Sequence, residues 1–375
     1  MPQMGHKQND SFISRAQRFF RSSIGCTESA PSRDEVSVEK SRSYDLRDQP
    51  PAQARSFHED YQLKGKLGKG AFAQVYVAHA ATDGAEVSVK ITDLRGSGKG
   101  DLTEPDARMK RAVEKEVQVL RRVGAQEYCV HFYGDYSEGL LSYIIMERCD
   151  MTLLQALERT PDLTEQTLVG IFREMLLGLH EIHRLGVVHR DIKPDNFLCT
   201  GSNCKVKLCD FGLAEVLQSQ SAELKGVYGT APFMSPEMLG ASSYGAGTDI
   251  WSLGVIVYVL LLGQFPYQPV ETTAKAMKAC ILAGLPAPTY KTKANLDFGG
   301  RFRTSTAALD FLYGTLNRNK AARLTAAACL KHTWISGVAE DPGQWGSPSL
   351  RPMLYSAKRA GAFDTRGVSP NDKPS

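Results

Sequence analysis

The spacing of hydrophobic and polar positions along this chain changes near residue 59 and again near residue 150. Between these points apolar and polar residues alternate, which is the two-residue period of half-buried strands, and turn residues separate the segments. The segments predicted as strands lie near 61–68, 74–81, 86–92 and 130–147. One segment of helical spacing, 108–124, interrupts them. This part of the chain is predicted to be built on a sheet.

Helical spacing dominates beyond Asp150. Apolar residues recur every three or four positions along one long segment, at Leu168, Ile171, Phe172, Met175, Leu176, Leu179 and Ile182. The apolar run Leu253–Leu262 is about half of the ~20 residues needed to cross a bilayer, so it predicts a buried helix and no integral membrane segment. A strand-rich part followed by a larger helical part predicts an α+β fold of two lobes with a cleft between them.

Both ends of the chain differ from its centre. Residues 1–58 are rich in Ser, Arg, Gln and Pro and show no sustained period, so we predict a disordered N-terminal tail. Within it, Phe12–Ile24 could form a short basic amphipathic helix, although a tail with a few aromatic residues is the favoured reading. Residues 337–375 are rich in Gly, Pro and Ser and are predicted as a disordered C-terminal tail.

Composition narrows the class of protein. The 375 residues are 42% hydrophobic and 23% charged, as in a globular protein. A net charge of +4 with no concentrated basic face argues against a nucleic-acid partner. The eight cysteines are scattered and form no CxxC pair, which favours free thiols in a reducing compartment, the cytoplasm or the nucleus.

The first chemical motif is the glycine-containing segment Leu67–Val75. Glycines between two strands let backbone amides approach phosphate oxygens, although an ordinary hairpin would look the same. The motif gains weight because Lys90 ends the next apolar strand and Glu116 lies on the helix that follows. A Lys–Glu pair bridging strand and helix would hold the ammonium group against nucleotide phosphates.

The most specific motif is His189–Asn196. The carboxylate of Asp191 can orient an attacking hydroxyl and accept its proton, and Lys193 can neutralise charge on a phosphoryl group. The amide oxygen of Asn196 can bind a hard cation. A second carboxylate, Asp210, follows a predicted strand and could bind the same kind of metal ion.

These motifs, in this order, resemble the eukaryotic protein kinase family from about Tyr61 to Ile335. The resemblance implies a kinase domain over 59–336, with an N-lobe to about residue 146 and a C-lobe from about residue 150. It implies transfer of the γ-phosphoryl group of ATP to a protein substrate, with Mg²⁺ or, in its place, Mn²⁺. No upstream regulator can be identified from the sequence.

The resemblance also assigns roles to individual residues. The catalytic residues would be Asp191, Lys193, Lys90 and Glu116, and the metal ligands would be Asn196 and Asp210. The nucleotide would contact Leu67, Gly68, Lys69, Gly70, Ala71, Phe72, Ala73, Val75, Ser88, Lys90, Met146, Glu147, Cys149, Asp150, Leu198 and Asp210.

Further downstream, Gly229–Glu237 is similar to the peptide-docking end of the family's activation segment, and Arg323 to the arginine that pairs with Glu237. Lys193 and Thr230 imply a preference for serine and threonine. The sequence from Asp249 onward is most similar to the calcium/calmodulin-dependent group of kinases.

The sequence departs from the family pattern at three places. Ala73 replaces the third glycine of the loop, and Ser88 replaces the alanine expected above the adenine ring. The hinge after Met146 is expected to run directly into a helix, which leaves Asp150 as the best candidate for the ribose contact.

Two questions stay open at this stage. The first is activity, since a pseudokinase scaffold that binds partners without turnover is the alternative to an active enzyme. The second is control. Arg190 could pair with a phosphorylated residue, with Ser221 favoured over Ser219 and Tyr228, or it could simply hydrogen-bond the backbone.

Overall fold

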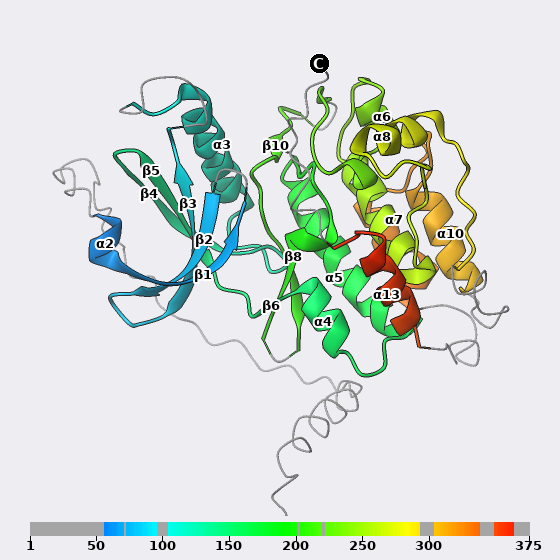
Figure 1. The fold of residues 1–375 in the computed structure, drawn as a ribbon, viewed down its shortest axis with the longest axis horizontal. Helices are drawn as coiled ribbons and strands as arrows, with labels where there is room; N and C mark the ends of the chain where they lie inside the picture. The colour runs from blue at the N-terminus through cyan, green and yellow to red at the C-terminus, as the bar shows by residue number, and fades with distance from the viewer. Residues whose placement is uncertain are drawn as a thin grey trace, which may run out of the picture. The chain divides into compact units, whose positions relative to one another are not determined.

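The computed structural model describes residues 56–70, 73–95, 104–201, 203–219, 222–292, 304–337 and 349–363. A sheet-rich region in blue and teal is followed by a larger helical region in green to red (Figure 1). The segment Phe12–Ile24 lies outside the described residues. No helix within the described ranges has both the length and the apolar character needed to cross a membrane.

The N-terminal region is a five-stranded antiparallel sheet with the strand order β1-β2-β3-β5-β4. Its strands are β1 (Tyr61–Lys69), β2 (Ala73–Ala80), β3 (Glu86–Asp93), β4 (Phe132–Glu138) and β5 (Leu141–Glu147). Alternate residues of the central strands are buried together, among them Val87, Val89, Tyr143 and Ile145. The predicted sheet is therefore present, with strand bounds close to those expected.

A short helix, α2 (Phe57–Asp60), adds to the core of this sheet. Phe57 is fully buried and its ring stacks on Tyr143, with the centroids 4.3 Å apart. The predicted tail of residues 1–58 therefore extends too far. A single aromatic residue next to polar neighbours gives no periodic signal, so its burial could not be read from the sequence.

Helix α3 (Ala107–Val123) carries Glu116 into the interior. The side chain of Asp106 caps its first turn by accepting hydrogen bonds from the backbone amides of Arg108 and Met109, at 2.7 and 3.1 Å. The helix ends at Gly124, which has a positive φ of 64°. Glu116 lies on the buried face of the helix, next to Val117.

The C-terminal region is built around α7 (Gly247–Leu262), in which every residue from Thr248 to Leu262 is buried. A helix that is apolar on all sides belongs at the centre of a helical core, as the run Leu253–Leu262 predicted. The other helices are α4 (Leu153–Arg159), α5 (Glu165–Arg184), α6 (Pro236–Leu239), α8 (Ala274–Ala283), α10 (Thr306–Thr315), α11 (Ala326–Lys331), α12 (Thr333–Ser336) and the single turn η2 (Ala231–Phe233).

Two small sheets frame the motif His189–Asn196. Strand β7 (Val187–Val188) precedes the motif and pairs with β10 (Glu215–Val216). The motif ends in the single turn η1 (Pro194–Asn196), which leads into β8 (Phe197–Thr200). Strand β8 pairs with β6 (Met151–Thr152) and β9 (Lys205–Leu208). The expectation that the hinge runs directly into a helix is therefore wrong, because β6 comes before α4.

The last helix, α13 (Arg351–Arg359), corrects the prediction of a disordered tail over 337–375. Met353, Leu354 and Ala357 are buried in the main core, and the red helix lies against the α7 region (Figure 1). Pro352 stands in the first turn, where proline costs no hydrogen bond, and Gly361 lies beyond the last turn. Proline and glycine, which are unfavourable inside a helix, thus stand at the two ends of α13, where they are tolerated. Residues 338–348 and 364–375 lie outside the described residues.

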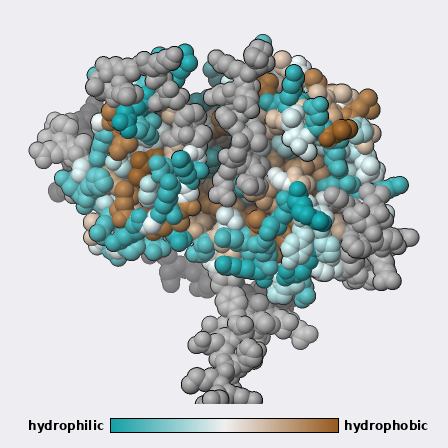
Figure 2. Space-filling model, viewed as in Figure 1, coloured by the Kyte–Doolittle hydropathy of each residue, from teal (hydrophilic) through white to brown (hydrophobic). Residues whose placement is uncertain are grey.

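The outer surface agrees with a globular domain. Hydrophilic residues cover much of the face seen in Figure 2, and brown hydrophobic residues gather in patches between them. Apolar residues on a surface are normal, because polar atoms alone cannot cover a protein.

Candidate active site

Three charged side chains from both regions of the domain meet at one point. The ammonium group of Lys90 on β3 donates to Glu116 Oε1 on α3 at 2.7 Å and to Asp210 Oδ1, just after β9, at 3.1 Å. The predicted Lys90–Glu116 pair is thus formed, and the structure adds Asp210 to it. The bridge requires α3 to lie close to the sheet.

The electrostatics of this cluster favour the charged forms of Lys90 and Asp210. Burial works against the charge of Lys90, but Asp210 and Glu116 outweigh it and raise its pKa well above the ordinary range. Lys90 in turn lowers the pKa of Asp210 to about 2. Gly212 leaves space here, because a Cβ at that position would lie 3.5 Å from both Glu116 Oε2 and Lys90 Nζ. An ammonium group held in this way is positioned for a bound anion.

Asp249 on α7 binds the backbone at the start of the His189–Asn196 motif. The fully buried carboxylate of Asp249 accepts hydrogen bonds from the amides of His189 and Arg190 and from His183 Nε2, each at 2.9 Å. Burial alone would favour the neutral acid, but His183 and the other donors outweigh it and lower the pKa of Asp249. The ionised carboxylate therefore holds the His189–Asn196 segment, here called the catalytic loop, in place. The sequence analysis did not predict this role, although a lone aspartate in the first turn of a fully apolar helix was a possible signal.

Asp191 is the centre of a compact polar cluster. Its Oδ1 accepts the hydroxyl proton of Thr230 at 2.8 Å, and its Oδ2 lies 3.0 Å from Lys193 Nζ. Lys193 also donates to Thr230 Oγ1 at 3.0 Å. The side-chain nitrogen Nδ2 of Asn196 donates to the backbone carbonyl of Asp191 at 2.7 Å. The structure thus adds Thr230, from a separate segment, to three residues of the His189–Asn196 motif.

The segment that carries Thr230 approaches the catalytic loop very closely. Gly229 has a φ of 95°, and a Cβ there would lie 2.4 Å from the carbonyl oxygen of Arg190, so only glycine fits without a shift. Ser252 on α7 holds the same segment by donating to the carbonyl of Phe233 at 2.7 Å.

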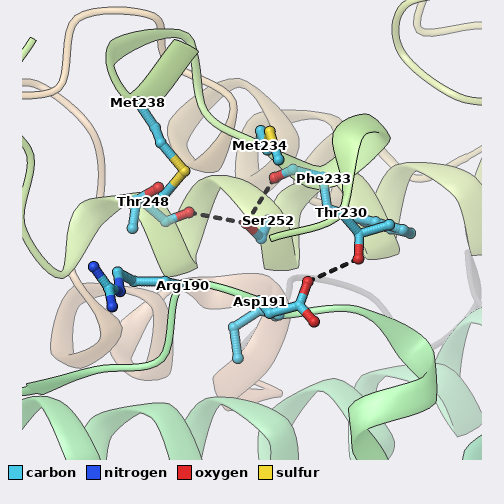
Figure 3. A pocket seen from close by; sticks show the side chains of 9 residues that line it. Arg190, Asp191, Thr230, Phe233, Met234, Met238, Thr248 and Ser252 are labelled. Atoms are coloured by element: carbon cyan, nitrogen blue, oxygen red, sulfur yellow. Dashed lines mark hydrogen bonds between the residues drawn. The ribbon is translucent and has the colours of Figure 1, made fainter. Parts of the chain in front are cut away.

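A small pocket lies beneath this segment and opens beside Asp191 (Figure 3). It is lined by Arg190, Asp191, Ile192, Thr230, Phe233, Met234, Met238, Thr248 and Ser252. The dashed lines in Figure 3 connect Thr230 with Asp191 and Ser252 with its two carbonyl acceptors. Catalytic loop, docking segment and α7 are therefore packed as one unit.

Arg190 contacts the activation segment through backbone and side chains. Its Nε donates to the carbonyl of Leu213 at 2.7 Å, and its guanidinium group stacks on the ring of Tyr228 at 4.2 Å. The backbone contact considered in the sequence analysis is therefore present. Ser221, the favoured phosphorylation candidate, lies outside the described residues.

Several of the predicted nucleotide contacts lie on the strands that also carry or adjoin Lys90. The loop lies between β1 and β2, where the amide of Gly70 donates to the carbonyl of Ala73 at 2.8 Å, while Ala71 and Phe72 lie outside the described residues. On β3, Ser88 lies opposite Met146 of β5.

Other predicted contacts in the hinge have structural partners. The side chain of Glu147 accepts from the amide of His131 at 3.1 Å and from Lys207 Nζ at 2.7 Å. The carboxylate of Asp150 accepts from the amide of Gly201 at 2.7 Å. The nucleotide roles of both residues, and those of Cys149 and Leu198, stay predictions.

The chemistry of Asn196 and Asp210 fits a magnesium ion. The nitrogen of the Asn196 side chain is committed to Asp191, which leaves its oxygen for a cation, and Asp210 supplies a second hard oxygen ligand. No group of three or more His, Cys, Asp or Glu side chains suited to a metal occurs in the described part of the chain. Two protein ligands are what Mg²⁺ commonly takes when nucleotide phosphates and water complete its shell.

The pair Arg323–Glu237 predicted by resemblance is also present. The two side chains form two parallel hydrogen bonds of 2.5 and 2.9 Å, and the guanidinium group lies 5.1 Å from the ring of Trp251. Arg323 also donates to the carbonyl of Gly247 at 2.8 Å. The docking segment is thus tied to the start of α7.

Comparison with known proteins agrees with this geometry. Serine/threonine-protein kinase PEPKR2 of Arabidopsis thaliana is 30% identical over 74% of this chain and 53% of its own length. CDPK-related kinase 5 of the same plant is 32% identical over 75% of this chain and 45% of its own length. Calcium/calmodulin-dependent protein kinase type 1 of Caenorhabditis briggsae is 30% identical over 76% of each chain.

The chain spans about half the length of the two plant relatives. The family model described as "Protein kinase domain" matches residues 61–335, nearly the range that the motifs predicted. The predicted two-lobed α+β fold and the predicted resemblance to serine/threonine kinases are confirmed by these matches. The chain belongs to the protein kinase family.

Proposed function

We propose that this chain is an active protein serine/threonine kinase, which transfers the γ-phosphoryl group of Mg-ATP to a hydroxyl group of a protein substrate. The observation that carries the proposal is the cluster around Asp191. A carboxylate that contacts both Lys193 and Thr230 is fixed in orientation, as a group that accepts the proton of a substrate hydroxyl must be. Its partners come from two separate segments of the chain, so the cluster forms only in the folded domain.

Each side chain has a distinct task in the proposed reaction. Asp191 orients the substrate hydroxyl and accepts its proton as the new O–P bond forms. Lys193 stabilises negative charge on the phosphoryl group during transfer, and Lys90, held by Glu116, positions the nucleotide phosphates. Asn196 and Asp210 would hold the magnesium ion, which supplies neutralisation of phosphate charge when it is bound.

The alternative, a pseudokinase scaffold, is disfavoured by the same residues. A scaffold has no need of an ion pair between Lys90 and Glu116, nor of a fixed carboxylate beside a lysine. Here each group is present and has a partner at hydrogen-bonding distance. A site of action in the cytoplasm or nucleus belongs to the same proposal and is supported by the free cysteines of the described residues.

The test is phosphoryl transfer itself. Purified chain is incubated with γ-labelled ATP, Mg²⁺ and a mixture of acceptor proteins, and the labelled products are hydrolysed to identify the phosphorylated amino acid. We expect label on serine or threonine, complete loss of labelling in EDTA, and recovery on addition of Mg²⁺ or Mn²⁺. Nucleotide binding without any transfer would favour the scaffold, and label on tyrosine alone would contradict the serine/threonine assignment.

A further inference from the structure

A serine stands in the proposed nucleotide site at a position close to the hinge. Ser88 lies on β3 two residues before Lys90, so both side chains project from the same face of the strand. Lys90 is opposite Ile144 on β5, whereas Ser88 is opposite Met146, at the end of β5 that leads into the hinge. Because Lys90 marks the phosphate end of the site, a nucleotide lying along this face would place its base near Ser88.

The hydroxyl group of Ser88 contacts the hinge backbone. Ser88 Oγ donates to the carbonyl oxygen of Glu147 at 3.0 Å and lies 3.3 Å from the carbonyl oxygen of Met146. The residue is 8% exposed, so water does not easily replace these contacts. A serine hydroxyl has one proton to donate and two lone pairs to accept with, and its proton can rotate.

This rotation matters for the recognition of a purine. A 6-amino group is a donor and is satisfied by a hinge carbonyl or by the Ser88 oxygen. A 6-oxo group is an acceptor, which hinge carbonyls alone leave unpaired and repel. The Ser88 hydroxyl can turn its proton toward such an oxygen. Alanine offers no donor, and an unpaired buried polar group is costly.

We propose that Ser88 sets the base selectivity of the nucleotide site, by letting the site accept 6-oxo purine nucleotides as well as adenine nucleotides. The inference rests on the proposed function, since it assumes that a nucleotide binds along β3. It predicts that this kinase discriminates weakly between ATP and ITP. The two nucleotides carry no group at position 2 and differ at position 6 and at N1, which accepts a hydrogen bond in adenine and donates one in hypoxanthine. The N1 difference is the same in wild type and in Ser88→Ala, so a change in preference between the two proteins reports on Ser88.

The experiment compares wild type with Ser88→Ala. The dissociation constants of Mg-ATP and Mg-ITP are measured by calorimetry, and kcat/KM is measured for both as phosphoryl donors. We expect the preference for ATP over ITP to rise about tenfold in Ser88→Ala, which corresponds to about 1.4 kcal/mol. ITP should account for most of the change.

Ser142→Ala is the matched control, because it removes a buried hydroxyl from β5 of the same sheet at the end away from the hinge. Its ATP/ITP preference should equal that of wild type. An unchanged preference in Ser88→Ala, with ATP binding intact, would overturn the role of Ser88 and leave the proposed function standing. Failure of wild type to bind either nucleotide would overturn both.

Discussion

Arg190 faces Glu215 of the activation segment, with Arg190 Nη2 lying 3.5 Å from Glu215 Oε2. Glu215 also pairs with Lys115 on α3, so one carboxylate links the catalytic loop to the helix that carries Glu116. Arg190 is nearly inaccessible, with 5% of its side chain exposed. A buried guanidinium group that already has a carboxylate partner does not need a phosphate to neutralise it.

The first prediction is that the unphosphorylated chain is active. Phosphatase-treated enzyme should keep its rate. Glu215→Gln removes the negative charge that pairs with both Arg190 and Lys115, and we expect it to lower the rate by about tenfold, which corresponds to about 1.4 kcal/mol. Glu223→Gln is the control, because Glu223 lies on the same segment but pairs with the exposed Lys320. Loss of activity on dephosphorylation would show that Arg190 awaits a phosphate after all.

The second prediction concerns the stability of the docking segment. Arg323→Met leaves the carboxylate of Glu237 buried without its partner, which should lower the free energy of unfolding by about 3–5 kcal/mol. Lys320→Ala breaks an ion pair with nearly half of each side chain exposed and should cost less than about 1 kcal/mol. Chemical denaturation of both variants measures the difference. Equal losses of unfolding free energy in the two variants would show that the buried pair stabilises the fold no more than the exposed pair does.

The same pair predicts a dependence of stability on pH. Burial opposes ionisation of Glu237, but the hydrogen bonds from Arg323 lower its pKa below the ordinary 4.5. A carboxyl group with a lowered pKa in the folded state stabilises fully above 4.5 and loses this contribution as the pH falls below that value. Denaturation at several acidic pH values should therefore show a smaller loss of stability in Glu237→Gln than in wild type. Parallel curves would argue against the assignment.

The third prediction is that α13 is part of the catalytic domain. Met353→Ala removes a fully buried side chain and should cost about 2–5 kcal/mol of stability. Tyr355→Ala, on the same helix but with its side chain largely exposed, should cost little. If both variants unfold at the same denaturant concentration as wild type, the helix does not contribute to the core in solution.

The fourth prediction concerns Cys209, directly before Asp210. Burial raises the pKa of its thiol well above 9.0, with the neighbouring Asp210 adding to the effect. Since the thiolate is the reactive form, iodoacetamide should label Cys209 slowly at pH 8 and faster as the pH rises, without a plateau below pH 9. Labelling of the urea-unfolded chain, followed by peptide mass spectrometry, is the control. Equally fast labelling of folded and unfolded chain at pH 8 would contradict the raised pKa.

The sequence predicted best those features that short motifs determine. Asp191, Lys193 and Thr230 could be singled out because each occurs in a local string, and the structure places their side chains within 3.0 Å of one another, while their roles stay predictions. The positions of the strands along the chain and of the central helix followed from hydrophobic periodicity, which reports directly on burial.

The missed features depend on contacts between distant parts of the chain. Asp249 anchors the catalytic loop from almost sixty residues away, and no local signal names its partners. Glu215 acts through Arg190 and Lys115, which are also far from it in sequence. Residues 349–363 were misjudged because the Gly, Pro and Ser content of 337–375 as a whole indicated disorder, although Pro352 stands in a first helical turn, where it fits.

The central claim is that Asp191 acts on the substrate hydroxyl and not on the nucleotide. Asp191→Asn keeps the size of the side chain but replaces one acceptor oxygen by an NH2 group and removes the basic carboxylate. We expect this variant to transfer phosphoryl groups at least ~10²-fold more slowly than wild type, with little change in its affinity for Mg-ATP. Single-turnover transfer and ATP binding, measured on the same protein samples, give the answer. A wild-type transfer rate in Asp191→Asn would contradict the catalytic assignment.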